Sequence, residues 1–328
     1  MDTVEQELPE YDNTAALIVT YHPDSGFPIR LERIFGQVAH VIVVDNTPEP
    51  ALAASLQSPG LDKVELIVNI RNEGLGYALN QGMKRAIELG FQWVLTLDQD
   101  TEVDGDMVEK LVEIARLDGA LGTLALVASN ARSFQSGRLY LRSKDTNKLF
   151  HEVKTPMTSG SLHSTAVYEA IGGFRAEFFI GSIDLEYCLR ARAHGFRILC
   201  SERALMTHAA GATEERHFLG RTVLIALQSP ARWYLDFRNL AWTIRHYWRR
   251  EPSWCTTTLW ALLKRWILLA VYETERAIKA KAIASGIRDG FSLRSMQNPQ
   301  SSMKASETYL KPLICPGRLF TDGPDGRA

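Results

Sequence analysis

The amino-acid sequence predicts an α/β fold in which a mainly parallel central sheet is flanked by helices. Short β-branched apolar runs alternate with segments of helical periodicity over residues 15–128. Strands that alternate with helices form βαβ units, whose parallel sheet is covered on both faces. The 328 residues are 45% hydrophobic and 23% charged, which is the composition of a globular protein with a large core.

Each element of this fold has its own signal in the sequence. Short apolar runs of β-branched residues predict buried strands, and these are Ala15–Tyr21, His40–Asn46, Val64–Asn69, Trp93–Leu97 and Leu124–Ala128. Apolar residues at helical spacing between the runs predict helices over Ile29–Gln37, Gly76–Leu89 and Asp106–Arg116.

The second half of the chain is less regular. We expect a loop over Lys154–Gly160, helices over Ser164–Ile171 and Ser182–His194, a C-cap at Gly195 and a strand over Phe196–Cys200. The pattern is helical from about Phe218, and residues 297–328 are polar and rich in Pro, Gly and Ser. The predicted organisation is therefore an α/β domain over 1–215, a helical extension over 216–296 and a flexible tail over 297–328.

Charge is distributed unevenly along the chain. Residues 1–215 contain 19 Lys/Arg and 30 Asp/Glu, whereas residues 216–328 contain 18 Lys/Arg and 8 Asp/Glu. This asymmetry predicts either an anionic partner for the second half, such as a membrane surface, or packing of the basic part on the acidic part. The net charge of −1 is small, and we expect no nucleic-acid partner.

The longest apolar stretch, Trp254–Tyr272, is interrupted at its centre by Lys264 and Arg265. A central charge costs about 2.5–3.5 kcal/mol in a spanning helix, so we expect no transmembrane span here. The stretch either lies in a membrane interface, for which Trp and Lys/Arg are typical, or packs on the core.

Cysteine usage and the N-terminus indicate a reducing, cytoplasmic location. The four cysteines have neither CxxC pairing nor the spacing of metal ligands, so we expect buried or incidental thiols. The acidic N-terminus lacks the apolar region of a secretory signal.

Polar residues follow four of the predicted strands. In open α/β sheets ligands bind at the carboxyl ends of the strands, so these residues predict one shared site. They are Thr20, Tyr21 and His22; Asp45 and Asn46; Arg71 and Asn72; and Asp98, Gln99 and Asp100.

Three acids and one histidine are the candidates for chemistry. Asp98 and Asp100 offer hard oxygen ligands for Mg²⁺ or Mn²⁺ bound to a diphosphate, although aspartates also cap helices. Asp184, in the first turn of a predicted helix, is either a general base or an acid that stabilises the helix dipole by about 0.3–1 kcal/mol. His208 is a further metal ligand, a phosphate contact or a structural residue.

Seven sequence blocks, in order, resemble an inverting nucleotide-sugar transferase of glycosyltransferase family two. The first four are VTYH (19–22), VVDN (43–46), NIRNEGLGYALNQG (69–82) and LDQD (97–100), and the later ones are TSGSL (158–162), IGGFRAEFFI (171–180) and IDLEYCLRARAHGFRI (183–198). The resemblance covers residues 15–245. Together with RWYLDFRN (232–239), these blocks look most like the bacterial rhamnosyltransferase branch, which uses dTDP-L-rhamnose to build surface polysaccharide such as lipopolysaccharide.

The resemblance implies a Rossmann-like GT-A fold, with residues 1–215 as the nucleotide-sugar-binding and catalytic domain. It implies that Asp184 is the catalytic base, with Glu186 as a second acid. The acceptor would be a saccharide or a lipid-linked saccharide at the inner face of the membrane. The donor and metal residues that it implies are Thr20, Tyr21 and Asp45 for the pyrimidine, Arg71 and Asn72 near the nucleotide, Asp98 for ribose or diphosphate, Asp100 for the metal, and His208 to complete the metal or diphosphate site.

One position departs from this pattern. Related rhamnosyltransferases usually read FID-x-x-D-x-E, whereas Gly181 replaces the first acid here. Two other functions are therefore kept open, namely transfer from another nucleotide sugar such as UDP-glucose and nucleotide-sugar binding without catalysis. A sugar nucleotidyltransferase would carry a Gly-rich loop after the first strand, but no glycine occurs there before Gly26.

Overall fold

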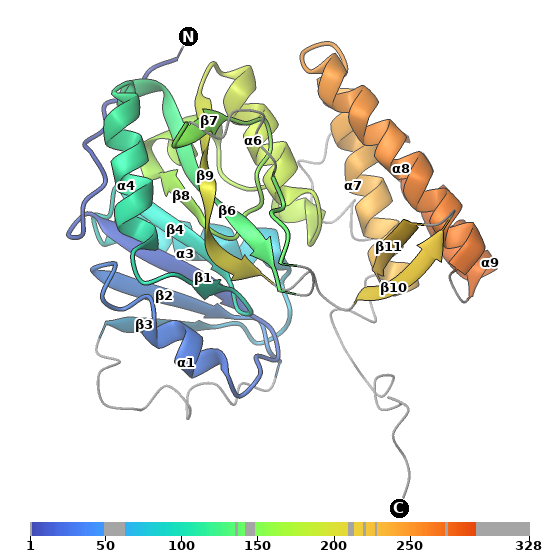
Figure 1. Cartoon of the computed structure of the whole chain (residues 1–328), viewed down its shortest axis with the longest axis horizontal. Helices are drawn as coiled ribbons and strands as arrows, with labels where there is room; N and C mark the ends of the chain where they lie inside the picture. Colours follow the sequence, from blue (N-terminus) through green and yellow to red (C-terminus); the bar gives the residue numbers. More distant parts are fainter. Residues whose placement is uncertain are drawn as a thin grey trace, which may run out of the picture.

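The computed structural model describes residues 2–48, 63–134, 137–141, 148–208, 213–218, 221–226, 228–272 and 275–292. An α/β domain with a central sheet lies beside a unit of a β-hairpin and three helices (Figure 1). The predicted tail over 297–328 and Cys315 lie outside the described residues. The other cysteines are buried free thiols, as the sequence predicts.

The central sheet has the strand order β3-β2-β1-β4-β8-β6-β9-β5, with β7 paired to β9. The strands are β1 Thr14–Thr20, β2 His40–Asp45, β3 Val64–Val68, β4 Trp93–Asp98, β5 Glu102–Val103, β6 Leu124–Ser133, β7 Phe150–Glu152, β8 Ser161–Ser164 and β9 Arg197–His208. The five strands predicted in the first half are confirmed to within a few residues, except that β6 is longer.

The prediction of a mainly parallel sheet holds only for part of it. β3, β2, β1 and β4 are parallel, as are β6 and β9, whereas β8 runs antiparallel to both β4 and β6. A parallel connection needs a crossover of a dozen or more residues, usually a helix. The described residues between β6 and β8 form no such helix, so β8 enters the sheet in the opposite direction.

Two apolar clusters cover the two faces of this sheet. Alternate residues of a strand point to opposite faces, so Leu17 and Ile42 belong to one cluster, and Ile18 and Val43 to the other. The helices are α1 Phe27–Glu32, α3 Leu75–Glu88, α4 Met107–Asp118, α5 Thr165–Ile171 and α6 Ile183–Ala193, with short 3₁₀ turns at Leu121–Thr123 and Ala176–Phe178. Residues of α3, α5 and α6 lie in the first cluster, and residues of α1 and α4 in the second.

Most of the predicted helices are confirmed. Ser164 caps α5, and Gly195 follows α6 with φ +88°, a conformation that favours glycine. The first helix is shorter than predicted because Ile34, Phe35 and Gln37 donate to carbonyls three residues back, as in a 3₁₀-type turn.

The prediction of helix from about Phe218 is wrong for Phe218 and for residues 221–226. β10 (Thr213–Phe218) and β11 (Arg221–Ala226) pair as an antiparallel hairpin. Helical structure begins at Pro230, where the Ser229 hydroxyl accepts from the Arg232 N–H at 3.3 Å.

The helices of the second unit are α7 Pro230–Tyr247, α8 Pro252–Tyr272 and α9 Arg276–Ser292. α7 supplies Leu240, Trp242 and Tyr247 to the first apolar cluster of the α/β domain, so the two units share a core. α8 exposes apolar side chains along most of its length. None of the described helices is long and apolar enough to cross a bilayer.

Candidate active site

A cavity of about 870 Å³ opens at the carboxyl ends of β1 and β4, and α6, α7 and α8 complete its walls. The structure brings most of the predicted site residues into this cavity. Those that line it are Thr20, Tyr21, Asn46, Asn72, Asp98, Gln99, Asp100, Asp184 and His208. They come from segments far apart in the chain, which the topology collects at one edge of the sheet.

Asp98, Asp100 and His208 form a compact group within the cavity. Each offers a ligand atom, and these atoms all lie within 4.8 Å of one another. His208 Nε2 lies 3.9 Å from an Asp98 oxygen, and Nδ1 lies 3.8 Å from an Asp100 oxygen. Two carboxylates and an imidazole suit Mg²⁺ or Mn²⁺.

A hydrogen-bond relay orients this group. The Thr101 hydroxyl lies 3.1 Å from His208 Nδ1 and 2.7 Å from the Ser159 hydroxyl, which accepts from the Asp98 N–H at 3.0 Å. Partners of this kind fix the ring orientation of metal-ligating histidines. Neither Thr101 nor Ser159 was assigned a role from the sequence, although Thr101 directly follows Asp100 and Ser159 lies within the TSGSL block.

The electrostatics of Asp98 favour a bound cation. The loss of hydration raises the pKa of its carboxyl to about 6, and the charges of Asp100 and Asp184 act in the same direction. His208 and Arg232 oppose this shift. About 39% of the side chain still faces the cavity, where a ligand can reach it. A divalent cation would relieve the repulsion, so the residues present fit one.

Asp184 lies in the first turn of α6 and lines the cavity. One of its oxygens accepts from the Leu185 N–H at 2.9 Å. Burial raises the pKa of its carboxyl above the ordinary value, which brings it closer to that of an effective general base.

The loop before Asp184 is held by α7. Phe179, Gly181 and Ser182 all have positive φ, a strained conformation for the two residues that are not glycine. The buried Asn239 amide donates to the carbonyls of Phe178, Ile180 and Gly181 at 2.9–3.1 Å. This contact explains the RWYLDFRN block, whose last residue positions the loop that carries the candidate base.

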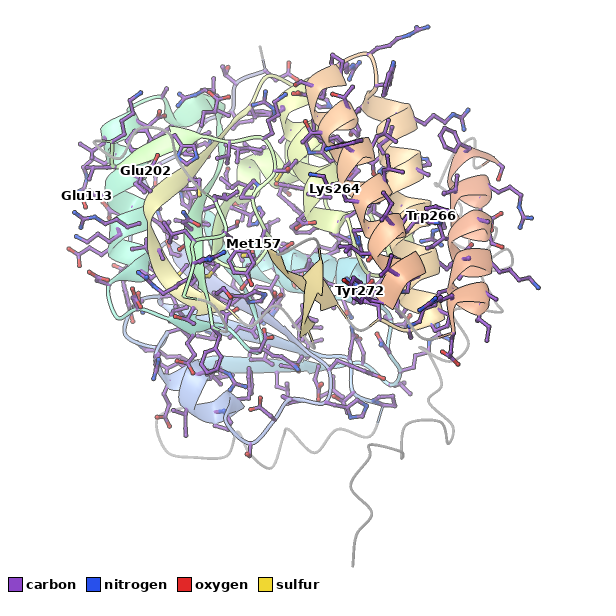
Figure 2. The ribbon with its side chains drawn as sticks, turned by 45° about the vertical axis from the view of Figure 1, so that its right-hand side comes forward. Glu113, Met157, Glu202, Lys264, Trp266 and Tyr272 are labelled. Atoms are coloured by element: carbon purple, nitrogen blue, oxygen red, sulfur yellow. The ribbon has the colours of Figure 1, made fainter. Side chains whose placement is uncertain are left out.

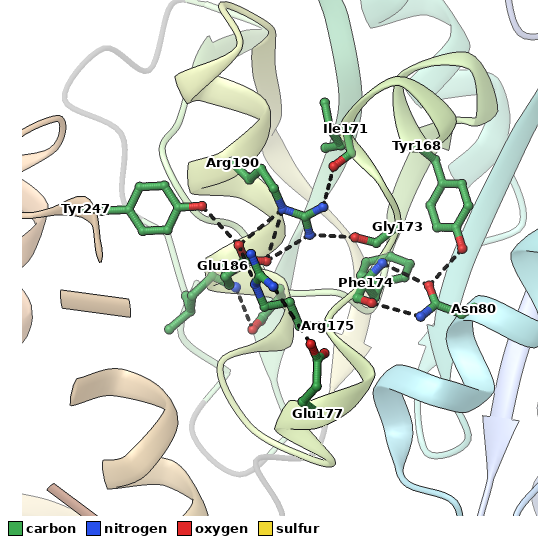
Figure 3. Close-up of polar contacts among 12 residues, drawn as sticks. Asn80, Tyr168, Ile171, Gly173, Phe174, Arg175, Glu177, Glu186, Arg190 and Tyr247 are labelled. Atoms are coloured by element: carbon green, nitrogen blue, oxygen red, sulfur yellow. Dashed lines mark hydrogen bonds and ion pairs between the residues drawn. The ribbon is translucent and has the colours of Figure 1, made fainter. Parts of the chain in front are cut away.

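Glu186 does not line the cavity, contrary to its expected role as a second acid. Its side chain is fully buried, and its carboxylate pairs with Arg190 at 2.8 Å and Arg175 at 3.0 Å (Figure 3). The Tyr247 hydroxyl donates to it at 3.0 Å. Glu186 therefore joins α6 to α7 and to the turn that precedes α6.

The expected nucleotide residues occupy different environments. Asp45 is fully buried behind the cavity wall, where one oxygen accepts from the Thr20 hydroxyl at 3.0 Å and from the Thr47 hydroxyl at 2.7 Å. Its other oxygen, Oδ2, is buried without a hydrogen-bond partner among the described residues. Arg71 does not line the cavity, because it extends into solvent and pairs with Glu73 at 2.7 Å.

Gln99 is a cavity residue to which the sequence analysis gave no separate role. Its side-chain amide accepts from the Tyr21 N–H at 2.7 Å and donates to the Tyr21 carbonyl at 3.2 Å. The amide thereby joins the ends of β1 and β4 beside the Asp98–Asp100–His208 group.

Comparison with known proteins identifies this architecture. The family model described as glycosyl transferase family 2 matches residues 16–173, a span that contains Asp45, Asp98 and Asp100. Residues 16–173 of the chain belong to glycosyl transferase family 2. The protein is a glycosyltransferase, and the sequence resemblance to this family is confirmed.

Two relatives match a longer part of the glycosyltransferase. The dTDP-rhamnosyl transferase RfbF of Shigella flexneri is 28% identical over 236 residues, which cover 69% of this chain and 78% of the relative. The low-salt glycan biosynthesis hexosyltransferase Agl10 of Haloferax volcanii is 25% identical over 243 residues, covering 70% and 74%.

Solved structures confirm the GT-A fold. S. aureus TarS superposes with a TM-score of 0.56 at 12% identity over 92% of this chain, and GalNAc-T7 with UDP, GalNAc and Mn²⁺ with 0.57 at 11% identity over 91%. The chain spans about half the length of these two proteins, 55% and 54%. TarS 1–349 in complex with UDP-GlcNAc superposes with 0.51 at 16% identity over 92% of this chain and 81% of that one.

Proposed function

We propose that this glycosyltransferase moves L-rhamnose from dTDP-L-rhamnose to a hydroxyl of a saccharide or lipid-linked saccharide, with inversion at the anomeric carbon. The observation that carries the proposal is the Asp98–Asp100–His208 group in the same cavity as Asp184. The similarity to the Shigella dTDP-rhamnosyl transferase supports the choice of donor.

The cavity residues divide the work of the proposed reaction. Asp184 accepts the proton of the acceptor hydroxyl, whose oxygen attacks the anomeric carbon from the face opposite the leaving diphosphate. Asp98, Asp100 and His208 would hold Mg²⁺ or Mn²⁺, which supplies positive charge for the diphosphate. The charge of Arg232 acts on both Asp98 and Asp184 and partly offsets the rise in pKa that burial causes.

Asp45 is the proposed contact to the base of the donor, and the base reaches it when the side chains that cover it move aside. Its Oδ2 atom is a buried acceptor without a described partner, and such an atom costs free energy until a donor pairs with it. The ring N–H of thymine or uracil is such a donor. This contact suits dTDP-rhamnose and UDP-glucose equally, so it does not distinguish between the two sugars.

Calorimetry of dTDP-L-rhamnose with the full chain tests the donor and the metal together. We expect the donor to bind in the presence of Mn²⁺. Binding should be at least about tenfold weaker with EDTA, or in Asp100→Ala, because one hydrogen bond to a charged group contributes about 1.5–3 kcal/mol. Asp104→Ala, which removes a nearby exposed carboxylate outside the cavity, should stay within about twofold of wild type.

The other outcomes of this calorimetry are equally informative. Preference for UDP-glucose would retain the mechanism and replace the donor. Metal-independent binding would contradict the role of Asp98, Asp100 and His208. Tight metal-dependent binding without transfer to any saccharide would favour a nucleotide-sugar-binding protein without catalysis.

We further propose that α8 rests on an anionic membrane surface. Trp260 is 60% exposed and Trp266 is 48% exposed, and Leu263 and Ile267 lie exposed near them. Figure 2 shows Trp266 on α8, beside α9. Exposed cations lie just before this helix and on α9, namely Arg249, Arg250, Arg276, Lys281 and Arg288. An apolar face that carries Trp, with basic residues around it, is typical of helices in a membrane interface.

Vesicle sedimentation tests this surface. The full chain should pellet with vesicles of equal parts phosphatidylglycerol and phosphatidylcholine at low salt, and less with phosphatidylcholine alone. Trp260→Ser/Trp266→Ser should weaken binding at least about tenfold, since each buried Trp side chain contributes about 1.5–3 kcal/mol. Leu117→Ser, at an exposed site on α4, is the control. No pelleting of wild type, or a shift from dimer to monomer in the double variant, would contradict the membrane proposal.

A further inference from the structure

One wall of the cavity carries charge that the mechanism above does not fully use. Asp236 on α7 and Arg265 on α8 line the cavity together with Arg232. Asp236 is held between the two guanidiniums, with Oδ1 3.3 Å from Arg232 Nε and Oδ2 3.3 Å from Arg265 Nη2. Its side chain is only 10% exposed, whereas those of Arg232 and Arg265 are 31% and 35% exposed.

The position of Asp236 depends on Gly181. A Cβ atom at residue 181 would lie 2.4 Å from Asp236 Oδ1 and 3.8 Å from Arg232 Nη2. Gly181 has φ +84°, so both its conformation and its surroundings favour glycine. Gly181 stands where related rhamnosyltransferases usually have an acidic residue, and its small size leaves room for the Asp236 carboxylate, which comes from α7.

Arg265 is built into this wall. Its guanidinium lies 4.8 Å from the centre of the Trp233 ring and 6.0 Å from that of Phe237, and Nη2 donates to the Gln228 amide oxygen at 3.0 Å. A guanidinium has five N–H donors. The contacts to Asp236 and Gln228 occupy Nη2 of Arg265, and the contact to Asp236 occupies Nε of Arg232. Both groups therefore retain donors for a ligand in the cavity.

The acceptor hydroxyl must reach Asp184 in the mechanism proposed above. Arg232 of this wall is within electrostatic reach of Asp184, and also of Asp98 on the metal side. Among the described residues, Arg265 contacts α7 and Gln228, which precedes that helix, and it makes no hydrogen bond, ion pair or ring contact with the strand ends that carry Thr20 and Asp98. Two guanidiniums against one carboxylate leave a net positive charge, which is complementary to an oxyanion.

Building on the function proposed above, we propose that Arg232 and Arg265, positioned by Asp236, form an acceptor subsite for an oxyanion. The ligand is a sugar that carries a phosphate or carboxylate group close to the hydroxyl that Asp184 deprotonates. The two guanidiniums bind the anion and orient the sugar, and Asp236 sets the spacing between them. The subsite therefore selects charged acceptors over neutral ones.

The test is calorimetry of glucose 1-phosphate with the full chain saturated with dTDP and Mg²⁺. We expect the sugar phosphate to bind alongside dTDP, and the neutral methyl glucoside to bind at least about tenfold more weakly. Arg265→Gln should weaken the binding of the sugar phosphate by about tenfold to 100-fold and leave the affinity for dTDP within about twofold of wild type. Lys264→Gln removes the same charge from the adjacent residue, which does not line the cavity, and should change neither affinity. Glucuronate in place of glucose 1-phosphate distinguishes a carboxylate from a phosphate.

The possible results of this calorimetry distinguish an acceptor subsite from a donor site. Competition between glucose 1-phosphate and dTDP, or an equal loss of both in Arg265→Gln, would assign the arginines to the donor and overturn the subsite. Equal binding of methyl glucoside would also overturn it. If the wild-type protein showed no metal-dependent binding of dTDP, the proposed function itself would be contradicted.

Gly181→Ala provides a second test of the geometry. Its Cβ can be accommodated only if Asp236 moves, so affinity for glucose 1-phosphate should fall at least about tenfold while dTDP still binds. Retained dTDP binding shows that the variant folds. Unchanged affinity for the sugar phosphate would show that Asp236 does not position the arginines.

Discussion

Replacing Asp184 by asparagine is expected to lower the turnover number by about 10²–10⁴-fold, the usual contribution of a general base. Asparagine keeps the shape of the side chain but cannot accept the proton of the acceptor hydroxyl. Affinity for the donor should be nearly unchanged, because the proposed donor contacts come from other segments. The measurement is release of dTDP from dTDP-L-rhamnose with an acceptor, alongside calorimetry of the donor.

The pH dependence should agree with this role. Burial raises the pKa of Asp184, so the base becomes protonated, and the rate falls, at a pH above the range of an ordinary aspartate. In a plot of turnover number against pH, the fall on the acidic side should therefore occur above the pKa range of an ordinary aspartate.

Asp106→Asn is the matched control, because Asp106 stands at the N-terminus of α4, away from the cavity. If Asp184 only stabilised its helix dipole, the two substitutions would have the same small effect on stability and none on turnover. An unchanged turnover number in Asp184→Asn would remove the residue from the role of base.

Replacing Glu186 by glutamine is expected to lower the free energy of unfolding by about 3–5 kcal/mol, the cost of removing one partner of a buried ion pair. The substitution leaves Arg175 and Arg190 without the carboxylate that joins them (Figure 3). The measurement is urea unfolding followed by circular dichroism. Glu113→Gln is the control. Glu113 lies on α4 (Figure 2) and pairs with Lys110 at 3.6 Å at the surface, so its loss should cost at most about 1 kcal/mol.

The ion pairs of Glu186 with Arg175 and Arg190 should also make the stability of the protein depend on pH. Burial alone would raise the pKa of Glu186, but the charges of Arg190 and Arg175 outweigh it and hold the pKa below the ordinary value. A carboxyl of lowered pKa contributes stability above its unfolded pKa and loses it as the pH falls through its folded pKa. The stability gap between wild type and Glu186→Gln should therefore narrow in acid. Equal stability of the two proteins at neutral pH would contradict the structural role of Glu186.

Local patterns were sufficient to predict much of the α/β domain. β1 to β4, α3 and α4 were placed to within a few residues, because buried strands and amphipathic helices have periodicities that short segments display. The same patterns located the strand ends, and hence most of the residues that line the cavity.

Pairing partners could not be predicted in the same way. β8 is only four residues long, and its antiparallel place between β4 and β6 depends on contacts across 30 or more residues of sequence. The apolar run in β11 is stabilised by β10 rather than by its own periodicity, so it was mistaken for the start of a helix.

The resemblance to glycosyltransferase family two, the alternating elements and the polar residues at the strand ends could all be predicted from the amino-acid sequence, because these are properties of contiguous segments. The roles of side chains whose partners lie far along the chain could be read only from the folded protein. Glu186 is buried in ion pairs although it stands two residues from Asp184, since a helix turns neighbouring side chains to different faces. The charged wall of the cavity depends on tertiary structure in the same way. Its residues come from a loop and two helices, and they meet only because α7 packs against the loop before α6; they are Gly181, Arg232, Asp236 and Arg265.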